Sequence, residues 1–392
     1  MPLVHLSDMI VHAYRHNYAV GAFGVGNLHF LEGIMQAAEN CRAPVVLNLI
    51  ESHFENQDFE LLMPAVQKAA RRATVPVAIN FDHGTSLASA ERAIRAGCNG
   101  VMVDTSALPF SDNLWQTRDV VAMAHACGVT VEGELGYVPG IEGENAKNHP
   151  GELAYTSAAE AAGFVERTGV DCLAVSIGTV HGRMKGLPKL DYARLAKIRE
   201  ATSVPLVIHG GTGLTDDQFR RLIANGVAKI DYYTALADMA NRRIRENVTA
   251  DPKGSHGALL TGVRDTVRGE AERCIHLWGS SGRAAEVLAQ CQPWHDVEHV
   301  VFYNIPATIS ESEITSIVRE GKKSLEAIPG VRSISTRRTL QPGGEYRHSL
   351  SVSLASKSAL TVFQNHPAQQ RFDNTNFWPM ITDHITLNLE EC

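Results

Sequence analysis

The first 230 residues repeat one pattern eight times: a short β-branched run that ends in polar residues, then a stretch with helical spacing. In one such stretch Leu28, Leu31, Ile34, Met35 and Ala38 share a face. Strands that alternate with helices indicate a parallel sheet, and eight units predict a closed (β/α)8 TIM barrel of the α/β class. The expected strands are residues 19–25, 44–50, 76–82, 100–104, 129–134, 171–177, 205–209 and 227–233.

Local signals agree with these helices. Thr215 and Gln218 have the spacing of a capping box, and Gly97 and Gly169 stand where helices end. An open, doubly wound sheet is the alternative architecture. Its G-x-G-x-x-G fingerprint after the first strand is absent, which favours the barrel.

After Asp251 the pattern changes. Residues 270–290 are expected to form one or two helices that close the barrel domain (1–290), and residues 291–298 a linker. Residues 299–392 then read strand, long helix, two strands, helix, strand, which is typical of a small ferredoxin-like α+β domain. The expected elements are residues 299–305, 310–328, 331–340, 347–355, 358–366 and 383–390.

Composition excludes several partners. The net charge is −7 without a basic block, which gives no support for a nucleic-acid or anionic-membrane partner. No apolar stretch reaches the roughly 20 residues of a membrane helix, and the N-terminus lacks the features of a signal peptide.

The seven cysteines form no CxxC pair. Cys41, Cys98, Cys127 and Cys172 are expected as small core residues, and the protein as cytoplasmic.

Polar residues gather at the strand ends, where a barrel of this type has its active site. Three of them are histidines from three strands, each near glycine. A single histidine at a strand end is most often structural, but three at one rim, with an open fourth position, predict a catalytic zinc site. The residues at these ends are Asp82, His83, Asp104, Ser106, Glu132, Glu134, His181, His209, Asp231 and Thr234.

The segment "HGGTG" (209–213) supplies a second feature. Loops after strands 7 and 8 of such barrels often bind phosphate through backbone N–H groups, and Gly210, Gly211, Thr212, Gly182 and Thr234 suit that role. The alternative is a tight turn into a helix. A metal beside a phosphate pocket indicates a phosphorylated carbonyl substrate, with Lewis-acid catalysis and a carboxylate that moves the proton. Aldol chemistry and isomerisation both fit.

The motifs "EGELG", "GTVHG", "PLVIHGGTG" and "KIDYYT", in this order, resemble those of the class II, zinc-dependent ketose-bisphosphate aldolases. The resemblance covers residues 1 to about 288. It implies that His83, His181 and His209 bind zinc or another divalent ion. It also implies that Asp82 is the acid/base at the C4 hydroxyl of a small phosphorylated sugar, which is cleaved to dihydroxyacetone phosphate and an aldehyde.

Further roles follow from the same resemblance. Glu142, in the loop 136–145, matches a glutamate that exchanges the proton on the dihydroxyacetone phosphate carbon. Asp104 and Glu134 match carboxylates that support the metal site. A monovalent cation near the phosphate and a homodimer or homotetramer are also implied. The residues matched to the phosphate end are Gly182, Gly210, Gly211, Thr212, Asp231 and Thr234.

The chain departs from the family pattern at five positions. Gly24 and Gly26 replace asparagines, Ile50 a serine, Asn80 a histidine and Asp231 an asparagine. We expect these changes to affect the substrate more than the mechanism, and hypothesise a ketose phosphate that is less anionic at one end than a bisphosphate.

Two rival mechanisms are kept open. A class I aldolase needs a Schiff-base lysine at a strand end, whereas Lys229 lies within a strand and Lys185 in a loop. The second alternative is a barrel without catalytic activity that serves as a binding or scaffold protein. The presence of Asp82, Glu142 and the three histidines argues against it.

The C-terminal part resembles the stress-responsive dimeric α/β-barrel (Dabb) family. The segment "HPAQQRF" (366–372) is similar to that family's HP-x-H segment, with Gln369 at the second histidine. The resemblance implies dimerisation through packed sheets. We expect a structural role in assembly, with a second ligand-binding or catalytic domain as the alternative.

Overall fold

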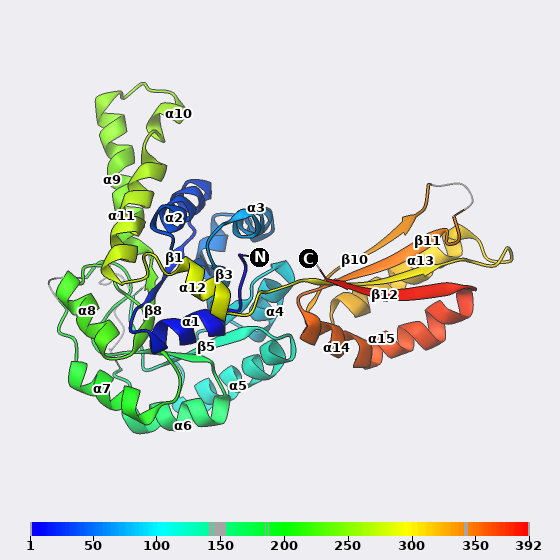
Figure 1. Cartoon of the computed structure of the whole chain (residues 1–392), viewed down its shortest axis with the longest axis horizontal. Helices are drawn as coiled ribbons and strands as arrows, with labels where there is room; N and C mark the ends of the chain where they lie inside the picture. Colours follow the sequence, from blue (N-terminus) through cyan, green and yellow to red (C-terminus); the bar gives the residue numbers. More distant parts are fainter. Residues whose placement is uncertain are drawn as a thin grey trace. The chain divides into compact units, whose positions relative to one another are not determined.

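The computed structural model describes residues 2–140, 144, 154–184, 186, 188–340 and 344–390. Its first part is a closed barrel of eight parallel strands in the order β1 to β8, as predicted (Figure 1). The strands are β1 (Val20–Gly24), β2 (Val45–Ile50), β3 (Val77–Gly84), β4 (Gly100–Val103), β5 (Thr130–Leu135), β6 (Cys172–Val175), β7 (Leu206–Ile208) and β8 (Val227–Tyr232).

Helices surround this barrel, and their ends follow the sequence signals. Thr215 and Gln218 form the predicted capping box, and Gly169 ends its helix in the left-handed conformation. The helical elements are α1 (Leu6–Arg15), α2 (Leu28–Cys41), η1 (Glu51–Glu55), α3 (Phe59–Arg72), α4 (Leu87–Ala96), α5 (Phe110–Ala126), α6 (Ala158–Thr168), α7 (Tyr192–Ala201), α8 (Asp216–Ala224), α9 (Thr234–Ala250), α10 (His256–Leu259), α11 (Val263–Leu277) and α12 (Ala284–Gln290).

Helices α9, α10 and α11 form an arm that projects from the barrel (Figure 1). Helix α11 packs closely against α2: a β-carbon at Gly33 of α2 would meet the backbone oxygen of Arg264 at 2.8 Å. Glycine therefore allows α2 and α11 to approach. The repeat implies a helix after the last strand, where α9 lies, and the helices expected over residues 270–290 correspond to the end of α11 and to α12. The projection of α9 to α11 as an arm was not predicted.

The N-terminal end of the barrel is apolar. Leu6, Met9 and Ile10 of α1 are buried in one cluster with Val20 and Val46 from the neighbouring strands. Burying each such side chain contributes roughly 1.5–3 kcal/mol. This end is a packed floor, and polar groups are left to the opposite rim. The four cysteines expected in the core are all buried and unpaired.

The C-terminal part forms a separate antiparallel sheet in the order β10-β11-β9-β12. The sequence order of its elements is the predicted one, consistent with a ferredoxin-like domain. The elements are β9 (Val297–Tyr303), α13 (Glu311–Glu326), β10 (Val331–Arg338), β11 (His348–Leu354), α14 (Lys357–Asn365), α15 (Pro367–Arg371), η3 (Phe372–Phe377), η4 (Trp378–Met380) and β12 (His384–Glu390).

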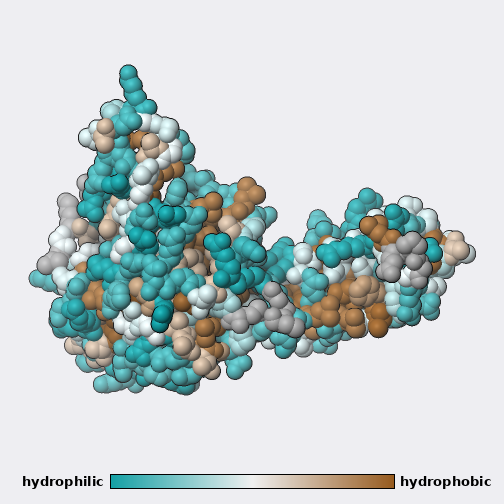
Figure 2. Space-filling model, turned by 45° about the horizontal axis from the view of Figure 1, so that its top comes forward, coloured by the Kyte–Doolittle hydropathy of each residue, from teal (hydrophilic) through white to brown (hydrophobic). Residues whose placement is uncertain are grey.

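Strand β12 lies at the edge of this sheet, and its residues are exposed. Ile385, Leu387 and Leu389 alternate along one face with 41%, 40% and 47% of their surface exposed. Apolar side chains gather visibly on this part of the chain (Figure 2). Within the described residues, we find no helix with the length and hydropathy needed to span a membrane.

Candidate active site

Strand β3 breaks its regular geometry where it reaches the rim. The pairing of β3 with β4 shifts register between Phe81 and Gly84, and His83 has a φ of 50°. Successive residues of a regular strand point to opposite faces, whereas a bulge with a left-handed residue re-aims them. This local distortion explains how two adjacent residues, Asp82 and His83, both belong to the same site.

Three histidines from β3 and from the loops after β6 and β7 converge at this rim. The Nε2 atom of His83 lies 2.9 Å from Nδ1 of His209, and Nε2 of His181 lies 3.4 Å from the same atom. All three ligand atoms lie within 4.8 Å of one another. The sequence predicted this set of residues, and the structure brings them together.

The second nitrogen of each ring is already engaged. Nδ1 of His83 lies 3.0 Å from Oδ2 of Asp104, and Nδ1 of His181 lies 3.0 Å from the backbone oxygen of Val138. Nε2 of His209 lies 2.7 Å from Oε1 of Glu132. Each of these nitrogens faces an oxygen acceptor, so in the neutral form of each ring it carries the proton and the inward-facing nitrogen carries the lone pair. Such backing partners orient the rings of metal-binding histidines.

This arrangement fits a divalent metal ion. Tetrahedral Zn–N bonds of 2.0–2.1 Å place the ligand nitrogens roughly 3.3 Å apart, close to the 2.9 Å and 3.4 Å that separate Nδ1 of His209 from the other two ring nitrogens. Three lone pairs that face one another repel, so a cation between them stabilises the cluster. Two further groups of residues also bring three possible ligand atoms within 4.8 Å of one another. One contains Asp82, His209 and Asp231, and the other contains His83, Asp104 and Glu134, so each shares a histidine with the first group.

A buried network of charged and amide side chains lies next to the histidines. Nζ of Lys229 is 2.7 Å from Oε2 of Glu132 and 2.5 Å from Oδ1 of Asp231. Asn48 donates to Oδ2 of Asp231 at 2.9 Å and to Oδ2 of Asp82 at 2.8 Å. The network therefore connects the backing partner of His209 to Asp82.

The charges in this network depend on each other. Burial would raise the pKa of Glu132, but Lys229 and His209 hold it at about 2, so the group is ionised. Burial raises the pKa of Asp231 to about 7, although Lys229 opposes the shift. Burial, together with the neighbouring Asp104, raises the pKa of Glu134 to about 8. Lys229 is itself fully buried, and its two carboxylate partners keep its pKa above the ordinary value.

The charge on Lys229 also bears on the class I alternative. A Schiff base requires a neutral amine that can reach the substrate. Lys229 is instead held as an ammonium between Glu132 and Asp231, with no exposed surface. Its placement favours an electrostatic role. Lys185 lies outside the described residues.

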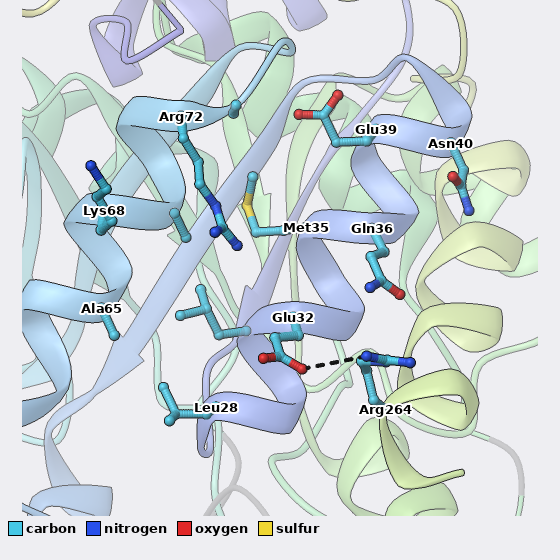
Figure 3. Close-up of a pocket in the computed structure, with 13 residues that line it drawn as sticks. Leu28, Glu32, Met35, Gln36, Glu39, Asn40, Ala65, Lys68, Arg72 and Arg264 are labelled. Carbon is cyan, nitrogen blue, oxygen red and sulfur yellow. Dashed lines mark ion pairs between the residues drawn. The ribbon is translucent and has the colours of Figure 1, made fainter.

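A cavity of about 200 Å³ opens beside the histidine cluster. Its walls contain both candidate metal-binding side chains and apolar side chains. The described residues that line it include neither lysine nor arginine. The lining residues are Ile50, Ser52, His83, Asp104, Tyr137, Val138, Gly140 and His181. A larger groove of about 560 Å³ lies outside the barrel, among α2, α3 and α11, and is lined by none of the predicted site residues (Figure 3).

The predicted phosphate-binding residues lie on tight turns near the start of α9. Gly210 has a φ of 67°, and a β-carbon there would lie 2.3 Å from the backbone oxygen of Val180. Gly182 also has a positive φ, of 77°. The Thr212 hydroxyl accepts the backbone N–H of Ala235 at 3.1 Å. Thr234 is the buried first residue of α9.

Two other predicted residues differ in placement from this group. Gly211 would accept a β-carbon at ordinary contact distances, so its backbone does not demand glycine. Asp231 directs both oxygens into the buried network, where Lys229 and Asn48 take them. We therefore leave Asp231 out of the proposed phosphate-binding group. Glu142, predicted to move a proton, lies outside the described residues.

The glycine departures have a packing explanation. A β-carbon at Gly24 would lie 2.6 Å from the ring of Tyr233, and one at Gly26 would lie 3.1 Å from its hydroxyl. The Tyr233 ring also packs against His53, with centroids 4.4 Å apart. The glycines and Tyr233 thus belong together, because larger side chains at positions 24 and 26 would need the space that the ring fills.

Sequence reasoning placed Glu132 at a strand end without giving it a role, considered Lys229 only for a Schiff base, and missed Asn48. Each is a polar residue in a run that is otherwise apolar: "VVLNLI", "VTVEGE" and "VAKIDY". Inside a closed barrel such a residue must find a partner, because burying an unpaired polar group costs about 1–3 kcal/mol. Polar interruptions of barrel strands were therefore the available signal.

The comparisons with known proteins agree with this site. Residues 4–283 match the family model "Fructose-bisphosphate aldolase class-II", and residues 297–390 match the "Stress responsive A/B Barrel Domain". The fructose-bisphosphate aldolase of Geobacillus stearothermophilus is 39% identical over 291 residues, which cover 73% of this chain and 100% of that protein. The corresponding protein of Staphylococcus aureus (strain Mu50) is 35% identical and covers 72% of this chain and 100% of its own length.

Solved structures give the same result. The YdjI aldolase of Escherichia coli K12 is 35% identical, with a TM-score of 0.65, and the match covers 72% of this chain and 99% of that one. A putative fructose-1,6-bisphosphate aldolase from Coccidioides immitis is 30% identical, with a TM-score of 0.66, over 72% of this chain and 98% of that one. This chain belongs to the class II fructose-bisphosphate aldolase family, an aldehyde-lyase family, and carries a C-terminal stress-responsive α/β-barrel domain.

Proposed function

We propose that this protein reversibly cleaves a phosphorylated ketose to dihydroxyacetone phosphate and an aldehyde, with zinc bound by His83, His181 and His209. The observation that carries the proposal is the convergence of three imidazole lone pairs beside Asp82. Oδ1 of Asp82 is buried and accepts no hydrogen bond from any described residue, so a hydroxyl of the substrate would supply the donor that it lacks.

Zinc held by the three histidines would supply a Lewis acid for the substrate's carbonyl group. In cleavage Asp82 accepts the proton of the C4 hydroxyl through Oδ1. The C3–C4 bond then breaks, its electron pair stays with the dihydroxyacetone phosphate half, and C4 becomes the aldehyde carbon. Condensation reverses these steps, and Asp82 returns the proton. Glu142 exchanges the proton on the carbon that carried the broken bond.

The phosphate of the dihydroxyacetone phosphate half binds at the turns that contain Gly182, Gly210 and Thr212, close to Thr234. The N-terminal end of α9 lies beside Thr212, which accepts the N–H of Ala235, and helix N-termini attract anions. The positive φ values of the two glycines fit tight turns of the kind that can aim backbone N–H groups at an anion.

The other end of the substrate is proposed to be uncharged. Ile50 and Val138 contribute apolar surface to the cavity, and its described lining offers no cation to a second phosphate. A ketose 1-phosphate suits this cavity better than a ketose bisphosphate. Comparing kcat/KM for fructose 1-phosphate with that for fructose and tagatose 1,6-bisphosphates tests this point. Ordinary turnover of either bisphosphate would exclude the uncharged end.

Asp82→Asn tests the reaction itself. The amide keeps the size of the side chain but cannot accept the proton, so we expect kcat to fall by roughly 10²- to 10⁴-fold. Zinc content, measured on the same protein by atomic emission, should stay at the wild-type level. Zinc-loaded wild-type protein that cleaves no ketose phosphate, and condenses dihydroxyacetone phosphate with no aldehyde, would instead favour a barrel used for binding.

We also propose that two copies of the chain associate through the C-terminal sheets. The apolar residues of β12 continue onto β9 at two of three pairs: Ile385 pairs with Phe302 and Leu387 with Val300, whereas Leu389 pairs with the exposed Glu298. This apolar surface of β9 and β12 supports a face-to-face dimer. The domain then serves assembly, without a second activity of its own.

A further inference from the structure

We propose that Asn48 is a positioning residue that holds Asp82 for proton transfer. The proposal rests on the function given above, since it concerns the acid/base that this function requires. Asn48 touches neither the histidine cluster nor the cavity lining in any described contact. Its effect on the reaction therefore acts through Asp82.

The geometry around Asn48 is specific. Its Nδ2 atom donates to Oδ2 of Asp82 at 2.8 Å and to Oδ2 of Asp231 at 2.9 Å. Its Oδ1 atom accepts from Nδ2 of Asn80 at 2.8 Å. Strands β2 and β3 set these contacts, because Asn48 pairs in register with Asn80, two residues before Asp82.

These contacts fix the orientation of the amide. Both N–H groups of Asn48 point to carboxylates, and its oxygen faces an N–H donor. A rotation of 180° would place the amide oxygen against Asp82 and Asp231 and leave the Asn80 donor facing an N–H group. Asn48 is only 1% exposed, so solvent cannot compensate for either loss.

The consequence for Asp82 is a division of labour between its two oxygens. Oδ2 is held by Asn48, and Oδ1 has no described hydrogen-bond partner. A carboxylate fixed at one oxygen presents the other in a defined direction, and proton transfer depends on that direction. Without the amide, Asp82 can rotate and lies beside a second buried carboxylate, Asp231, with no shared donor between them.

Two half-reactions separate this role from a structural one. Cleavage requires Asp82, because the C4 hydroxyl must lose its proton. Exchange of the dihydroxyacetone phosphate carbon-bound proton with D2O does not, because this compound has no C4 hydroxyl. A positioning residue for Asp82 should affect cleavage alone, whereas loss of metal or of folded protein should lower both rates.

The experiment measures both rates for zinc-loaded wild-type enzyme and Asn48→Ala, with a ketose phosphate that the wild type turns over. We expect kcat for cleavage to fall roughly 10- to 100-fold with KM nearly unchanged. We expect the exchange rate, followed by NMR in D2O, to stay within about twofold of wild type. Equal losses in cleavage and exchange, or no loss in cleavage, would overturn the proposal.

Asn113→Ala is the matched control. Asn113 is also a buried amide, 2% exposed, and it donates to the backbone oxygen of Glu134 and accepts from Thr105. It has no described contact with Asp82, so its loss should leave the ratio of cleavage to exchange unchanged. If Asn48→Ala does not fold, Asn80→Ala decides instead, because it removes the donor that orients Asn48. A lowered ratio supports the proposal and an unchanged ratio refutes it.

Failure of the proposed function has a different signature. If zinc-loaded wild-type protein neither cleaves a ketose phosphate nor exchanges the dihydroxyacetone phosphate proton, the aldolase assignment fails before any variant is compared. If the wild type does both and Asn48→Ala retains the wild-type ratio, the assignment stands and the role of Asn48 is rejected.

Discussion

In the barrel every strand residue is buried except His83, whereas in the C-terminal sheet every residue of β12 is exposed. The barrel has no free edge, and its interior holds charged groups that are paired with one another. The C-terminal sheet ends in an edge strand with an apolar face. Every strand of the first region is paired on both sides, while the second region ends in a strand with an exposed apolar face.

The difference shows where this chain keeps its chemistry. A charge inside a closed barrel costs several kcal/mol unless a partner of opposite sign lies beside it, so each buried ion implies a defined neighbour. That requirement produces fixed geometry, which catalysis needs. An exposed apolar strand imposes no such geometry but favours association. Variants in the two regions should therefore have separable effects.

The largest effect on turnover is expected for His209→Ala. The change removes one of three converging lone pairs and also the proton donor to Glu132. Loss of a residue that only hydrogen-bonds to a metal ligand costs up to about 100-fold in activity. Loss of the ligand itself should lower turnover by at least that factor. Zinc content, measured after gel filtration, should fall with it. His299→Ala, which removes a buried histidine of the C-terminal sheet, should leave zinc content unchanged; equal zinc in both variants would contradict the proposed site.

The next largest effect is a loss of stability in Lys229→Met. Methionine fits the space but leaves Glu132 and Asp231 as buried carboxylates without a cation. Breaking a buried ion pair in this way typically costs about 3–5 kcal/mol in the free energy of unfolding. Urea unfolding followed by tryptophan fluorescence, to which the buried Trp278 of the barrel part contributes, measures the loss.

Lys357→Met provides the contrast from the C-terminal part. Lys357 pairs with Glu390, but its side chain is 73% exposed, so water replaces the lost interaction. We expect little change in the urea midpoint. A similar loss in both lysine variants would show that the buried network contributes no more than a surface pair.

The fold could be predicted because its signals are local and repeated. Eight β-branched runs separated by helical stretches specify the barrel, and the observed strands fall within one or two residues of the expected limits, as β1 at Val20–Gly24 illustrates. The projection of α9 to α11 as an arm could not be predicted from the repeat. Its place depends on the close contact of Gly33 with α11, between segments far apart in sequence.

The candidate site was predictable in part for a related reason. The rule that strand ends meet at one rim identifies His83, His181 and His209 without knowledge of distances. It does not reveal Asn48, whose partners come from β3 and β8. It also does not reveal that Asp231 contacts both Lys229 and Asn48. Such contacts depend on register and on the bulge at His83, which only the three-dimensional structure provides.

A smaller effect is expected for Asp104→Asn, which keeps an oxygen acceptor for Nδ1 of His83 but removes the negative charge. The imidazole becomes less basic, so zinc affinity should fall by about 10- to 100-fold. Competition with a fluorescent chelator measures this affinity directly, independently of turnover. Asp112→Asn on the surface of α5 should keep wild-type affinity. Unchanged affinity in Asp104→Asn would mean that the histidine needs an acceptor but not a charge.

The smallest effect on turnover is expected for Leu387→Glu, which tests the other side of the comparison. The glutamate places a charge in the apolar face of β12, where a second sheet would have to desolvate it. The mass in sedimentation should shift from dimer toward monomer, while turnover per chain stays within about twofold of wild type. Thr386→Glu, on the opposite face of the same strand, should leave the mass unchanged. A monomeric wild-type protein would show that this face does not join two copies, and so would equal dissociation in both variants. A large loss of turnover in Leu387→Glu alone would mean that the barrel needs the dimer for activity.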